Sequence, residues 1–387
     1  MVFLAHAFPR HEHDVVGGFL LRLAVALRGE GIEVTAVAPA APGVAAADRL
    51  AGVAVRRYRY APGRAQRLAY AGEMHRRAAS PGGAVALAGL LGAGAVAARS
   101  AARGADLVHA HWWFPGGVQA LLARTGLPLV TTLHGTDVRL ARSRPAARAA
   151  CARVLRRSAV VTAVSGWLAG QAAAIAPGLP APRVAPMPAD EAAFHPLAGD
   201  LPREELLFVG RLDRQKGAEV ALRAVAELRG AAGGLPLRLV GDGPGREDLR
   251  RLAGELGLAG RVRWEGQLPQ AELADRYRRA AALLVPGRDE GLGLVAVEGQ
   301  LAGAPVLAAA SGGLLDVVTD GQTGLTFPPG QPAALARAIE TLLSDPAAAA
   351  RLAEAGRRSA AARFTTTTAA RAYAAVYAEA LQAARRP

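Results

Sequence analysis

The stretch Ala-Leu-Leu-Val-Pro-Gly-Arg-Asp-Glu-Gly-Leu-Gly-Leu-Val-Ala-Val-Glu, residues 282–298, organises the second half of this chain. An apolar strand over 282–285 runs into a glycine-rich turn, and a helix is predicted to begin near Leu292. Glycines let a ligand approach the backbone closely, and the first-turn N–H groups of a helix favour a phosphate. Glu290 would lie beside that phosphate, with Glu298 about two turns deeper. This suits a ligand with a central phosphate and hydroxyls at both ends, such as a nucleotide sugar.

The overall composition bounds the protein class. A chain of 387 residues is longer than one hydrophobic core ordinarily accommodates, so two domains are expected. A composition of 51% hydrophobic and 20% charged residues is typical of a globular protein. The net charge of +14 points to nucleic acid, an anionic membrane or phosphorylated substrates, with a plain solvated basic surface as the alternative. Arginine is abundant and lysine almost absent, which indicates coding bias. A single cysteine, Cys151, excludes an internal disulfide and fits a reducing cytoplasm.

Two apolar segments raise the question of membranes. Residues 1–5 have no basic segment before them and are too short for a signal peptide. Residues 82–98 are mostly alanine and glycine, and arginines flank them on both sides: Arg76, Arg77, Arg99 and Arg103. This run is shorter than a confident membrane span, so we expect a buried or interfacial helix. We therefore expect a cytoplasmic protein with peripheral contact to an anionic membrane.

The first half alternates strands and helices. Strands are predicted over 2–5, 34–39, 53–60, 107–111, 129–133, 160–164 and 183–186. Gly17 and Gly18 stand between the first strand and an amphipathic helix, which is typical of the phosphate-binding half of a doubly wound fold. The loop residues His11 to Asp14 could be interpreted as metal ligands, but their spacing favours an exposed polar loop.

An arginine- and tyrosine-rich segment follows, with arginines at positions 56, 57, 59, 64, 67, 76 and 77. Interleaved aromatic residues could stack on nucleic acid bases. They could also lie at a membrane surface beside the 82–98 helix, or the segment could simply be solvated. We favour the membrane or solvated interpretation over nucleic acid.

Polar residues gather after two strands of the first half. His111 ends the strand 107–111, and His134, Thr136 and Asp137 follow the strand 129–133. Ligands of open α/β sheets collect outside the carboxyl ends of the strands, so these four residues are expected in the active-site region.

A proline-rich segment over 186–202 predicts a linker. The expected domains are 1–195 and 203–368, with a final helix over 369–385 that crosses back to the first domain. Strands are predicted over 206–209, 237–240, 261–264, 282–285 and 305–309, with helices between them, which indicates a second parallel sheet. The fold class is thus α/β, with two doubly wound Rossmann-like domains expected to face each other across a cleft.

The turn after the strand 206–209 carries Arg211 and Lys216, five residues apart. Two fixed cations facing helix N–H groups would hold a diphosphate and stabilise its charge as it departs. The alternative is a pair of ordinary surface salt bridges.

Across nearly its whole length, the chain resembles the retaining glycosyltransferases of the GT-B fold, specifically the family 4 (GT4) group. The order and spacing of several short motifs carry this resemblance: Gly17-Gly18, His134 to Asp137, Val164 to Gly166, Val209 to Arg211 with Lys216-Gly217, Val240 to Pro244, Glu290 to Glu298, Gly303 to Val306, Gly312-Gly313 and Asp320 to Gly324. The chain departs from the family pattern at Met187 to Asp190, at Asp316 and at Gly287, which bears on donor geometry.

The resemblance implies a role for each matching residue. The implied catalytic residues are His134, Arg211, Lys216 and Glu290. Glu290 would hold the hydroxyls of the donor sugar and Glu298 the nucleotide ribose. The implied donor-binding set also includes Gly18, Gly210, Gly291, Gly293, Leu294 and Val295. The implied acceptor region comprises Gly17, His111, Thr136 and Asp137.

The expected activity is transfer of a hexose from a UDP- or GDP-sugar to a hydroxyl of a glycan, lipid-linked or small-molecule acceptor, with retention of configuration. No Asp-x-Asp occurs in the chain, so neither a metal nor a cofactor beyond the donor is expected. One alternative is a nucleotide-sugar epimerase or hydrolase, and another is a non-catalytic carbohydrate- or polyanion-binding protein. A dinucleotide-dependent oxidoreductase is disfavoured because no Gly-x-Gly-x-x-Gly follows the first strand.

Overall fold

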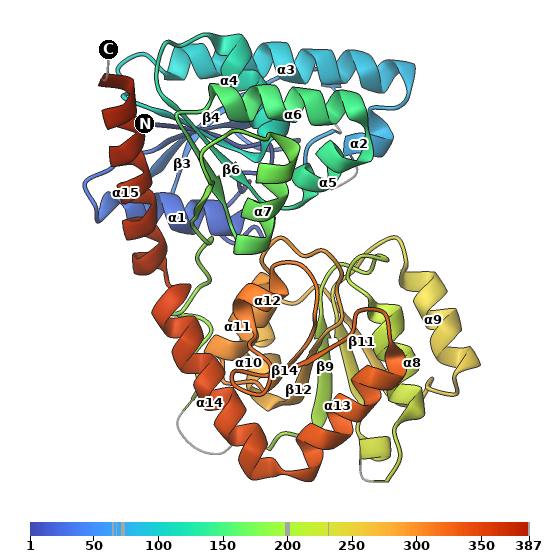
Figure 1. Ribbon diagram of the computed structural model, residues 1–387. Coiled ribbons are helices and arrows are strands. Elements are labelled where there is room, and N and C mark those ends of the chain that lie inside the picture. Colours follow the sequence, from blue (N-terminus) through green and yellow to red (C-terminus); the bar gives the residue numbers. More distant parts are fainter. Residues whose placement is uncertain (64–65, 67, 71–73, 198–201, 231, 386–387) are drawn as a thin grey trace. The chain divides into compact units, whose positions relative to one another are not determined.

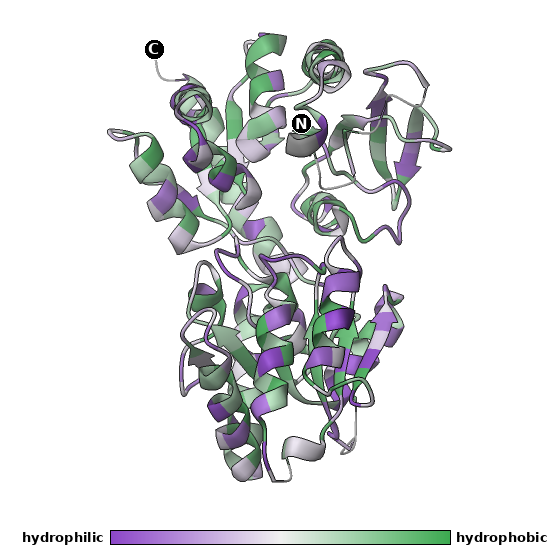
Figure 2. Cartoon of the chain, turned by 90° about the vertical axis from the view of Figure 1, so that its right-hand side faces the viewer, coloured by the Kyte–Doolittle hydropathy of each residue, from purple (hydrophilic) through white to green (hydrophobic). Residues whose placement is uncertain are grey.

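The computed structural model describes residues 1–63, 66, 68–70, 74–197, 202–230 and 232–385. The chain divides into two compact units (Figure 1). The first unit comprises Met1–Pro188 together with Thr366–Pro387, and the second comprises Ala189–Thr365. Both are α/β units in which hydrophobic strands lie between helices that carry many of the polar residues (Figure 2). The predicted fold class of two Rossmann-like units is confirmed.

The first unit is built on an eight-stranded sheet with the order β3-β4-β2-β1-β5-β6-β7-β8. All neighbours pair in parallel except β3, which is antiparallel to β4. The strands are β1 (Val2–Leu4), β2 (Thr35–Pro39), β3 (Ala47–Leu50), β4 (Val53–Tyr58), β5 (Val108–His111), β6 (Leu129–Leu133), β7 (Val160–Ala163) and β8 (Arg183–Val184). The sequence did not predict β3 because it has only four residues, Ala-Asp-Arg-Leu, of which three are exposed, so no apolar pattern marks it.

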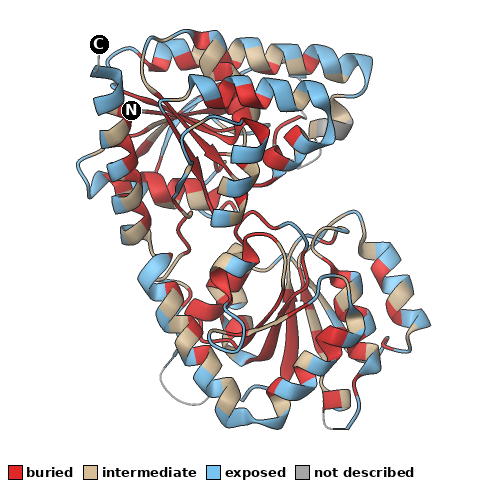
Figure 3. Cartoon of the chain, in the orientation of Figure 1, coloured by how far each residue is buried: buried red, intermediate tan, exposed pale blue. Residues whose placement is uncertain are grey.

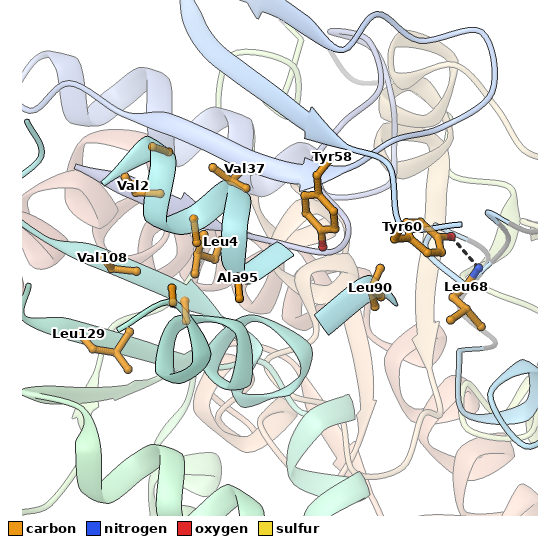
Figure 4. Close-up of a cluster of buried hydrophobic side chains, with 14 of the residues drawn as sticks. Val2, Leu4, Val37, Tyr58, Tyr60, Leu68, Leu90, Ala95, Val108 and Leu129 are labelled. Carbon is orange, nitrogen blue, oxygen red and sulfur yellow. Dashed lines mark hydrogen bonds between the residues drawn. The ribbon is translucent and has the colours of Figure 1, made fainter. Parts of the chain in front are cut away.

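Helices cover both faces of this sheet. They are α1 (Gly18–Arg28), α2 (Met74–Arg77), α3 (Pro81–Ala101), α4 (Val118–Ala123), α5 (Thr136–Ser143), α6 (Pro145–Arg157), α7 (Gly166–Ile175) and α15 (Thr366–Arg385). The start of α3 is fixed by Ser80, whose side chain accepts a hydrogen bond from the N–H of Gly83, and by Pro81 in the first turn. Leu90 and Ala95 of α3 pack with Val2, Leu4 and other strand residues in a buried cluster (Figure 4).

The final helix, α15, returns to the first unit as predicted. It packs against α1 and against β6 and β7. Tyr373 and Tyr377 are its largest buried residues, and Glu379 forms an ion pair of 3.0 Å with Arg183 of β8.

The second unit contains a six-stranded, fully parallel sheet with the order β11-β10-β9-β12-β13-β14. Its strands are β9 (Glu205–Val209), β10 (Leu237–Val240), β11 (Val262–Gly266), β12 (Ala280–Val285), β13 (Val306–Ala309) and β14 (Leu325–Phe327). Its helices are α8 (Ala218–Glu227), η3 (Ala232–Gly234), α9 (Arg246–Glu255), α10 (Gln270–Arg279), α11 (Leu294–Leu301), α12 (Leu314–Val317), α13 (Pro332–Ser344) and α14 (Pro346–Arg363). The short edge strand β14 was not predicted from the sequence.

Each sheet has one point where the strand order reverses. In the first unit this point lies between β1 and β5, and in the second it lies between β9 and β12. Ligands of doubly wound sheets bind outside the carboxyl ends of the strands at this point. The topology therefore selects two loop clusters, one in each unit, as the places to look for a site.

The chain passes between the units at Pro188 and Ala189, seven residues before the expected boundary at 195. The N–H of Ala189 donates to the carbonyl of Phe364 over 2.9 Å, and the Phe194 ring lies 5.6 Å from that of Tyr277. Residues 189–195 thus fold with the second unit. Residues 198–201 of the predicted linker lie outside the described residues.

In the described part of the arginine- and tyrosine-rich segment, two of the three tyrosines are buried and Tyr70 is half-buried. Tyr58 and Tyr60 are buried in the core of the first unit. Arg57 is also buried; its guanidinium donates to the Tyr70 hydroxyl and to the Pro9 carbonyl, whereas Arg56 and Arg59 are exposed. Arg64, Arg67 and the side chain of Arg76 lie outside the described residues. Buried rings cannot stack on bases, which removes the basis of the nucleic-acid alternative for these two tyrosines.

Candidate functional site

The turn after β9 is held by one carboxylate. Asp213 accepts hydrogen bonds from the N–H groups of Gln215 and Lys216, both over 3.1 Å. Its other oxygen lies 3.2 Å from Nε of Arg211. A side chain that bonds its own downstream backbone stabilises a turn in this way. The turn therefore fixes the backbone from which both predicted cations project.

Lys216 and Glu290 form the central contact of the site. Nζ of Lys216 lies 2.8 Å from Oε1 and 3.0 Å from Oε2 of Glu290. The Glu290 side chain is only 9% exposed, so this pair is shielded from water on the carboxylate side. Lys216 is also the only lysine among 46 basic residues, so an ammonium persists here in a chain that otherwise uses arginine. A compact ammonium and a guanidinium differ in reach and geometry, so an arginine at this position would not reproduce the same contact with Glu290.

The loop that carries Glu290 is packed closely against two glycines. The N–H of Gly313 donates to the Glu290 carbonyl over 2.8 Å. A Cβ on Gly312 would lie 2.7 Å from backbone atoms of Glu290, and one on Gly313 would lie 2.2 Å from the Gly291 carbonyl oxygen. Close backbone approach of this kind requires glycine. The Arg288 N–H also donates to the Gln215 carbonyl over 2.9 Å, which ties this loop to the turn after β9.

A small pocket opens where β9 and β12 end. Its lining includes Phe208, Lys216, Pro286, Glu290, Gly293 and Val295. Gly293 precedes α11 with a left-handed backbone (φ 91°), and the first turn of α11 follows directly. First-turn N–H groups lack partners within their helix, and they carry the positive end of its dipole. The pocket thus brings together one ammonium, one carboxylate and a helix N-terminus.

Glu298 lies in the second turn of α11 and has a partner that sequence reasoning missed. The hydroxyl of Tyr277, in α10, donates to Oε2 of Glu298 over 3.0 Å. Tyr277 is fully buried, and burial, together with the Glu298 charge, raises the pKa of its phenol well above its usual value. The phenol therefore stays protonated and orients the carboxylate. The sequence offered no signal for this role, because Tyr277 lies 21 residues from Glu298.

The second unit thus brings most of its predicted residues together. Lys216, Glu290, Gly293 and Val295 line one pocket. Gly210 begins the turn after β9 that carries Arg211. Gly291 follows Glu290 in the loop after β12, and Leu294 is the first residue of α11. Arg211 is 40% exposed and pairs with Asp213, and Glu298 lies one turn further along α11 than the pocket residues.

In the first unit, the switch point holds a layer of aromatic rings. The His111 ring lies 4.0 Å from that of His109 and 5.4 Å from that of His134. Trp112 lies 4.3 Å from His134 and 4.5 Å from His6. Burial lowers the pKa of His109, His111 and His134 well below the usual value, and it lowers the pKa of His6 to about 4. These imidazoles are therefore neutral at neutral pH.

The hydrogen bonds of this layer fix a tautomer. Nδ1 of His111 lies 3.2 Å from Nε2 of His134, so one of the two must donate. Nε2 of His111 is buried and has no hydrogen-bond partner among the described residues. A buried N–H without a partner costs more than a bare ring nitrogen. His111 therefore donates through Nδ1–H, and His134 carries its own proton on Nδ1.

His109 connects this layer to the C-terminal helix. Its Nδ1 lies 2.9 Å from the Tyr377 hydroxyl and its Nε2 lies 2.6 Å from Oγ1 of Thr132. The Tyr373 hydroxyl donates to the Ala185 carbonyl over 2.8 Å. Helix α15 is therefore part of the support behind His111 and His134.

Asp137 organises the loop before α5. Its Oδ1 accepts from the N–H groups of His134 and Gly135, at 3.1 and 2.9 Å, and its Oδ2 accepts from the N–H of Trp113 at 3.2 Å. The side chain is buried, and burial raises the pKa of its carboxyl. Asp137 and the fully buried His111 therefore help to hold the loops after β5 and β6, and their assignment to an acceptor region stays a prediction. Thr136, by contrast, is exposed.

The two glycines after β1 differ in what requires them. Gly17 has φ 77°, and a Cβ there would lie 1.6 Å from the Ala7 carbonyl oxygen. A Cβ on Gly18 would meet only the Arg22 guanidinium, at 3.4 Å. Packing of the chain on itself thus accounts for Gly17, while Gly18 starts α1 at the switch point.

The loop over residues 9–14 is held in place by an ion pair and hydrogen bonds within the protein. Arg10 and Asp14 form a two-pronged ion pair, and Arg10 holds the pKa of Asp14 at about 2 against the raising effect of burial. Glu12 accepts from the Ala51 N–H over 2.6 Å, and His11 and His13 are exposed. Within the described ranges, no three His, Cys, Asp or Glu side chains are grouped to hold a metal ion.

Comparison with known proteins places the chain in a family. The models for "Glycosyl transferases group 1" and "Glycosyltransferase Family 4" match residues 191–359 and 16–188. A D-inositol 3-phosphate glycosyltransferase of Streptomyces avermitilis is 38% identical over 316 residues, which are 73% of this chain and 67% of that protein. A glycogen synthase of Mycobacterium tuberculosis is 34% identical over 293 residues, 73% of this chain and 70% of that protein.

The fold is similar to that of solved structures over almost the whole chain. A sucrose-phosphate synthase of Thermosynechococcus elongatus has a TM-score of 0.82 and 26% identity, and the match covers 99% of each chain. An Anabaena protein in complex with UDP and glucose has a TM-score of 0.73 at 19% identity, covering 97% of this chain and 98% of that one, a likeness of fold alone. On its sequence, its two-unit fold and these relatives, the chain belongs to the family 4 glycosyltransferases of the GT-B fold.

Proposed function

We propose that this glycosyltransferase moves a hexose from a UDP- or GDP-sugar to a hydroxyl acceptor with retention of configuration. One observation carries the proposal: Lys216 contacts both oxygens of Glu290 in a pocket beside the first turn of α11. A nucleotide sugar presents a diphosphate and sugar hydroxyls next to each other. The ammonium and the helix N-terminus suit the diphosphate, and the carboxylate suits the hydroxyls.

Donor binding would exchange the partners of these side chains. Lys216 is paired with Glu290 and Arg211 with Asp213. A bound diphosphate would draw both cations away from their carboxylates. Glu290 would then accept hydrogen bonds from the sugar hydroxyls. The carboxylate thus holds Lys216 in place before the donor arrives, which lowers the cost of ordering it on binding.

The chemical step follows from where charge develops. The bond between the anomeric carbon and the phosphate oxygen breaks, and the electron pair leaves with the nucleoside diphosphate. Arg211 and Lys216 stabilise that charge. The acceptor hydroxyl attacks the same face of the sugar and gives its proton to the departing phosphate, so configuration is retained. His134, with its proton on Nδ1, would donate a hydrogen bond to an oxygen of the sugar or of the phosphate.

Glu298 would hold the two ribose hydroxyls of the nucleotide. Its carboxylate is half-buried, and the Tyr277 hydroxyl fixes one of its oxygens. A pre-oriented carboxylate can accept from both hydroxyls of a ribose, a group that UDP and GDP share. The site therefore recognises the nucleotide by its ribose and diphosphate.

We extend the proposal to the acceptor and the location. Relatives are named for inositol 3-phosphate and sucrose phosphate, so phosphorylated polyols and sugars should be screened first, before glycans and lipid-linked acceptors. We place the activity in the cytoplasm, as expected from a single cysteine. Cys151 is buried and burial raises the pKa of its thiol, which keeps it unreactive.

The proposal is tested by a binding screen of UDP-, GDP- and ADP-sugars followed by product analysis. Because Lys216 is the only lysine, reductive methylation with ¹³C-formaldehyde labels one side chain besides the N-terminal amine. We expect a UDP- or GDP-sugar to raise the melting temperature and shift the Lys216 methyl signal. An acceptor product with the donor's anomeric configuration, formed equally fast with EDTA, supports retention without a metal. Donor hydrolysis or epimerisation without acceptor product would contradict the assignment.

A further inference from the structure

Helix α3 carries an apolar face that the first unit does not cover. Val85 is 74% exposed and Val96 is 71% exposed. Ala84, Ala88 and Gly92 of the same helix are exposed as well, and Leu122 of the neighbouring α4 is 54% exposed. We call these six residues the α3 face. The opposite side of α3 packs into the core through Ala86, Leu90 and Ala98, so the helix lies on the unit (Figures 3 and 4).

The surroundings of the α3 face are strongly basic. Arg99 in the last turn of α3 donates to the carbonyls of Ala123 and Arg124, which joins the ends of α3 and α4. Exposed Arg103 and Arg124 therefore lie at that same end. Helix α6, which also packs against α4, exposes four arginines along its length: Arg148, Arg153, Arg156 and Arg157.

Carboxylates are almost absent from this region. Between residues 74 and 188 the sequence has 13 arginines and only two acidic residues, Asp106 and Asp137. Asp137 is buried among backbone N–H groups. A mixed-charge surface would place carboxylates among the arginines, as the second unit does on α9. The α3 face thus has an apolar strip bordered by exposed arginines, in a stretch of sequence with few carboxylates.

We propose that the α3 face docks this protein on an anionic phospholipid surface. Small apolar side chains enter the headgroup region while arginines contact lipid phosphates, which is how amphipathic helices lie on membranes. Among the described residues, α3 is also the one helix long and apolar enough to cross a membrane by length and composition. Because α3 packs into the core of the first unit, we expect it to lie on the membrane surface. A membrane-spanning α3 would remove Leu90 and its neighbours from that core. This inference does not rest on the proposed donor or acceptor.

A second copy of the chain is the competing occupant. Ala84, Ala88 and Gly92 recur every four residues, a spacing that also allows close packing of two helices. The charge opposes this alternative, because a dimer through the α3 face would bring two sets of the same arginines together. The observations therefore favour an anionic partner.

The test is flotation of the full chain with vesicles of phosphatidylcholine, with and without phosphatidylglycerol. We expect binding only with the anionic lipid at low salt, and its loss at high salt. The double variant Val85→Ser with Val96→Ser should bind about ten-fold more weakly, and so should Arg103→Gln with Arg124→Gln. Leu315→Ser, at a side chain 53% exposed in the second unit, is the matched control and should bind like the parent chain.

Folding is checked by the melting temperature, which the exposed substitutions should leave nearly unchanged. Absence of binding to anionic vesicles at low salt would overturn the proposal. Equal binding of the double valine variant would show that charge alone acts and that the α3 face is not the docking surface. A concentration-dependent dimer in sedimentation experiments, lost in the double valine variant, would assign the α3 face to a second copy instead.

Discussion

The two units share a doubly wound architecture but differ in charge and in how they use polar residues. The first unit has 25 Lys and Arg against nine Asp and Glu, a formal charge of +16. The second has 21 against 23, a formal charge of −2. Seven of the eight histidines belong to the first unit, and the only lysine belongs to the second. The apolar pattern sets the common fold, while the polar residues at the strand ends give each unit its own chemistry.

The largest effect should come from the lysine of the second unit. Replacing Lys216 with Ala is expected to lower turnover about 10²- to 10³-fold, because a fixed charge at the departing phosphate is lost. Lys216→Arg should recover part of the activity, since the charge returns with a different geometry. Arg214→Ala, in the same turn and exposed, is the matched control. Initial rates at saturating donor measure the effect, and full activity of Lys216→Ala would remove the donor site from this pocket.

Gly17 and Gly18 of the first unit allow a test of whether the packing of the backbone or a bound ligand requires a glycine. Gly17→Ala should destabilise that unit by about 2–4 kcal/mol, because it combines a left-handed backbone with a Cβ against the Ala7 carbonyl. Gly18→Ala should change stability by less than about 1 kcal/mol, since only a flexible arginine is near. Denaturant unfolding compares the two variants. Equal stabilities would contradict the packing explanation for Gly17.

The histidine layer should make the first unit acid-sensitive. Its histidines have pKa values below the 6.5 of the unfolded chain, so between the two values the unfolded state binds more protons. Stability should therefore fall as pH drops below 6.5, by up to about 1.4 kcal/mol per pH unit for each buried histidine. The raised pKa of Asp137 acts in the opposite direction at lower pH. Asp14 loses its contribution as the pH falls from its unfolded pKa of 3.8 through its folded pKa of about 2.

The second unit is the internal control for this acid response, because its only histidine, His195, is exposed. Trp112 and Trp113 report on the first unit and Trp264 on the second. Single-tryptophan variants unfolded at pH 7.5 and 5.5 should show a shift for the first unit alone. A similar shift at Trp264 would show that the histidine layer is not its cause.

The smallest effect concerns the support of Glu298. Tyr277→Phe keeps the buried ring but removes the hydroxyl that holds Oε2. We expect donor affinity to fall about five- to ten-fold, equivalent to about 1 kcal/mol for one hydrogen bond. Tyr373→Phe removes a hydroxyl from the first unit and should leave donor affinity unchanged. Calorimetric titration with the donor nucleotide distinguishes the two variants.

The local patterns identified many elements but missed two edge strands. Apolar runs marked the central strands because those strands are buried on both faces. They missed β3, whose residues are mostly exposed, and β14, which has only three residues. The expected helix start near Leu292 lies two residues before the observed start at Leu294, because Gly293 takes a left-handed conformation.

The sequence by itself determined the family, the parallel strands of both sheets and the loop residues Lys216 and Glu290 that line the pocket of the second unit, because these depend on local period and on motif spacing. Only the tertiary structure decided the order of the strands, and with it the reversal between β9 and β12 that brings Lys216 to Glu290 across 74 residues. It also decided that Asp137 is a buried loop organiser, that Tyr277 holds Glu298, and that one face of α3 stays uncovered. Each of these depends on contacts between residues far apart in the chain, and no local pattern records such contacts.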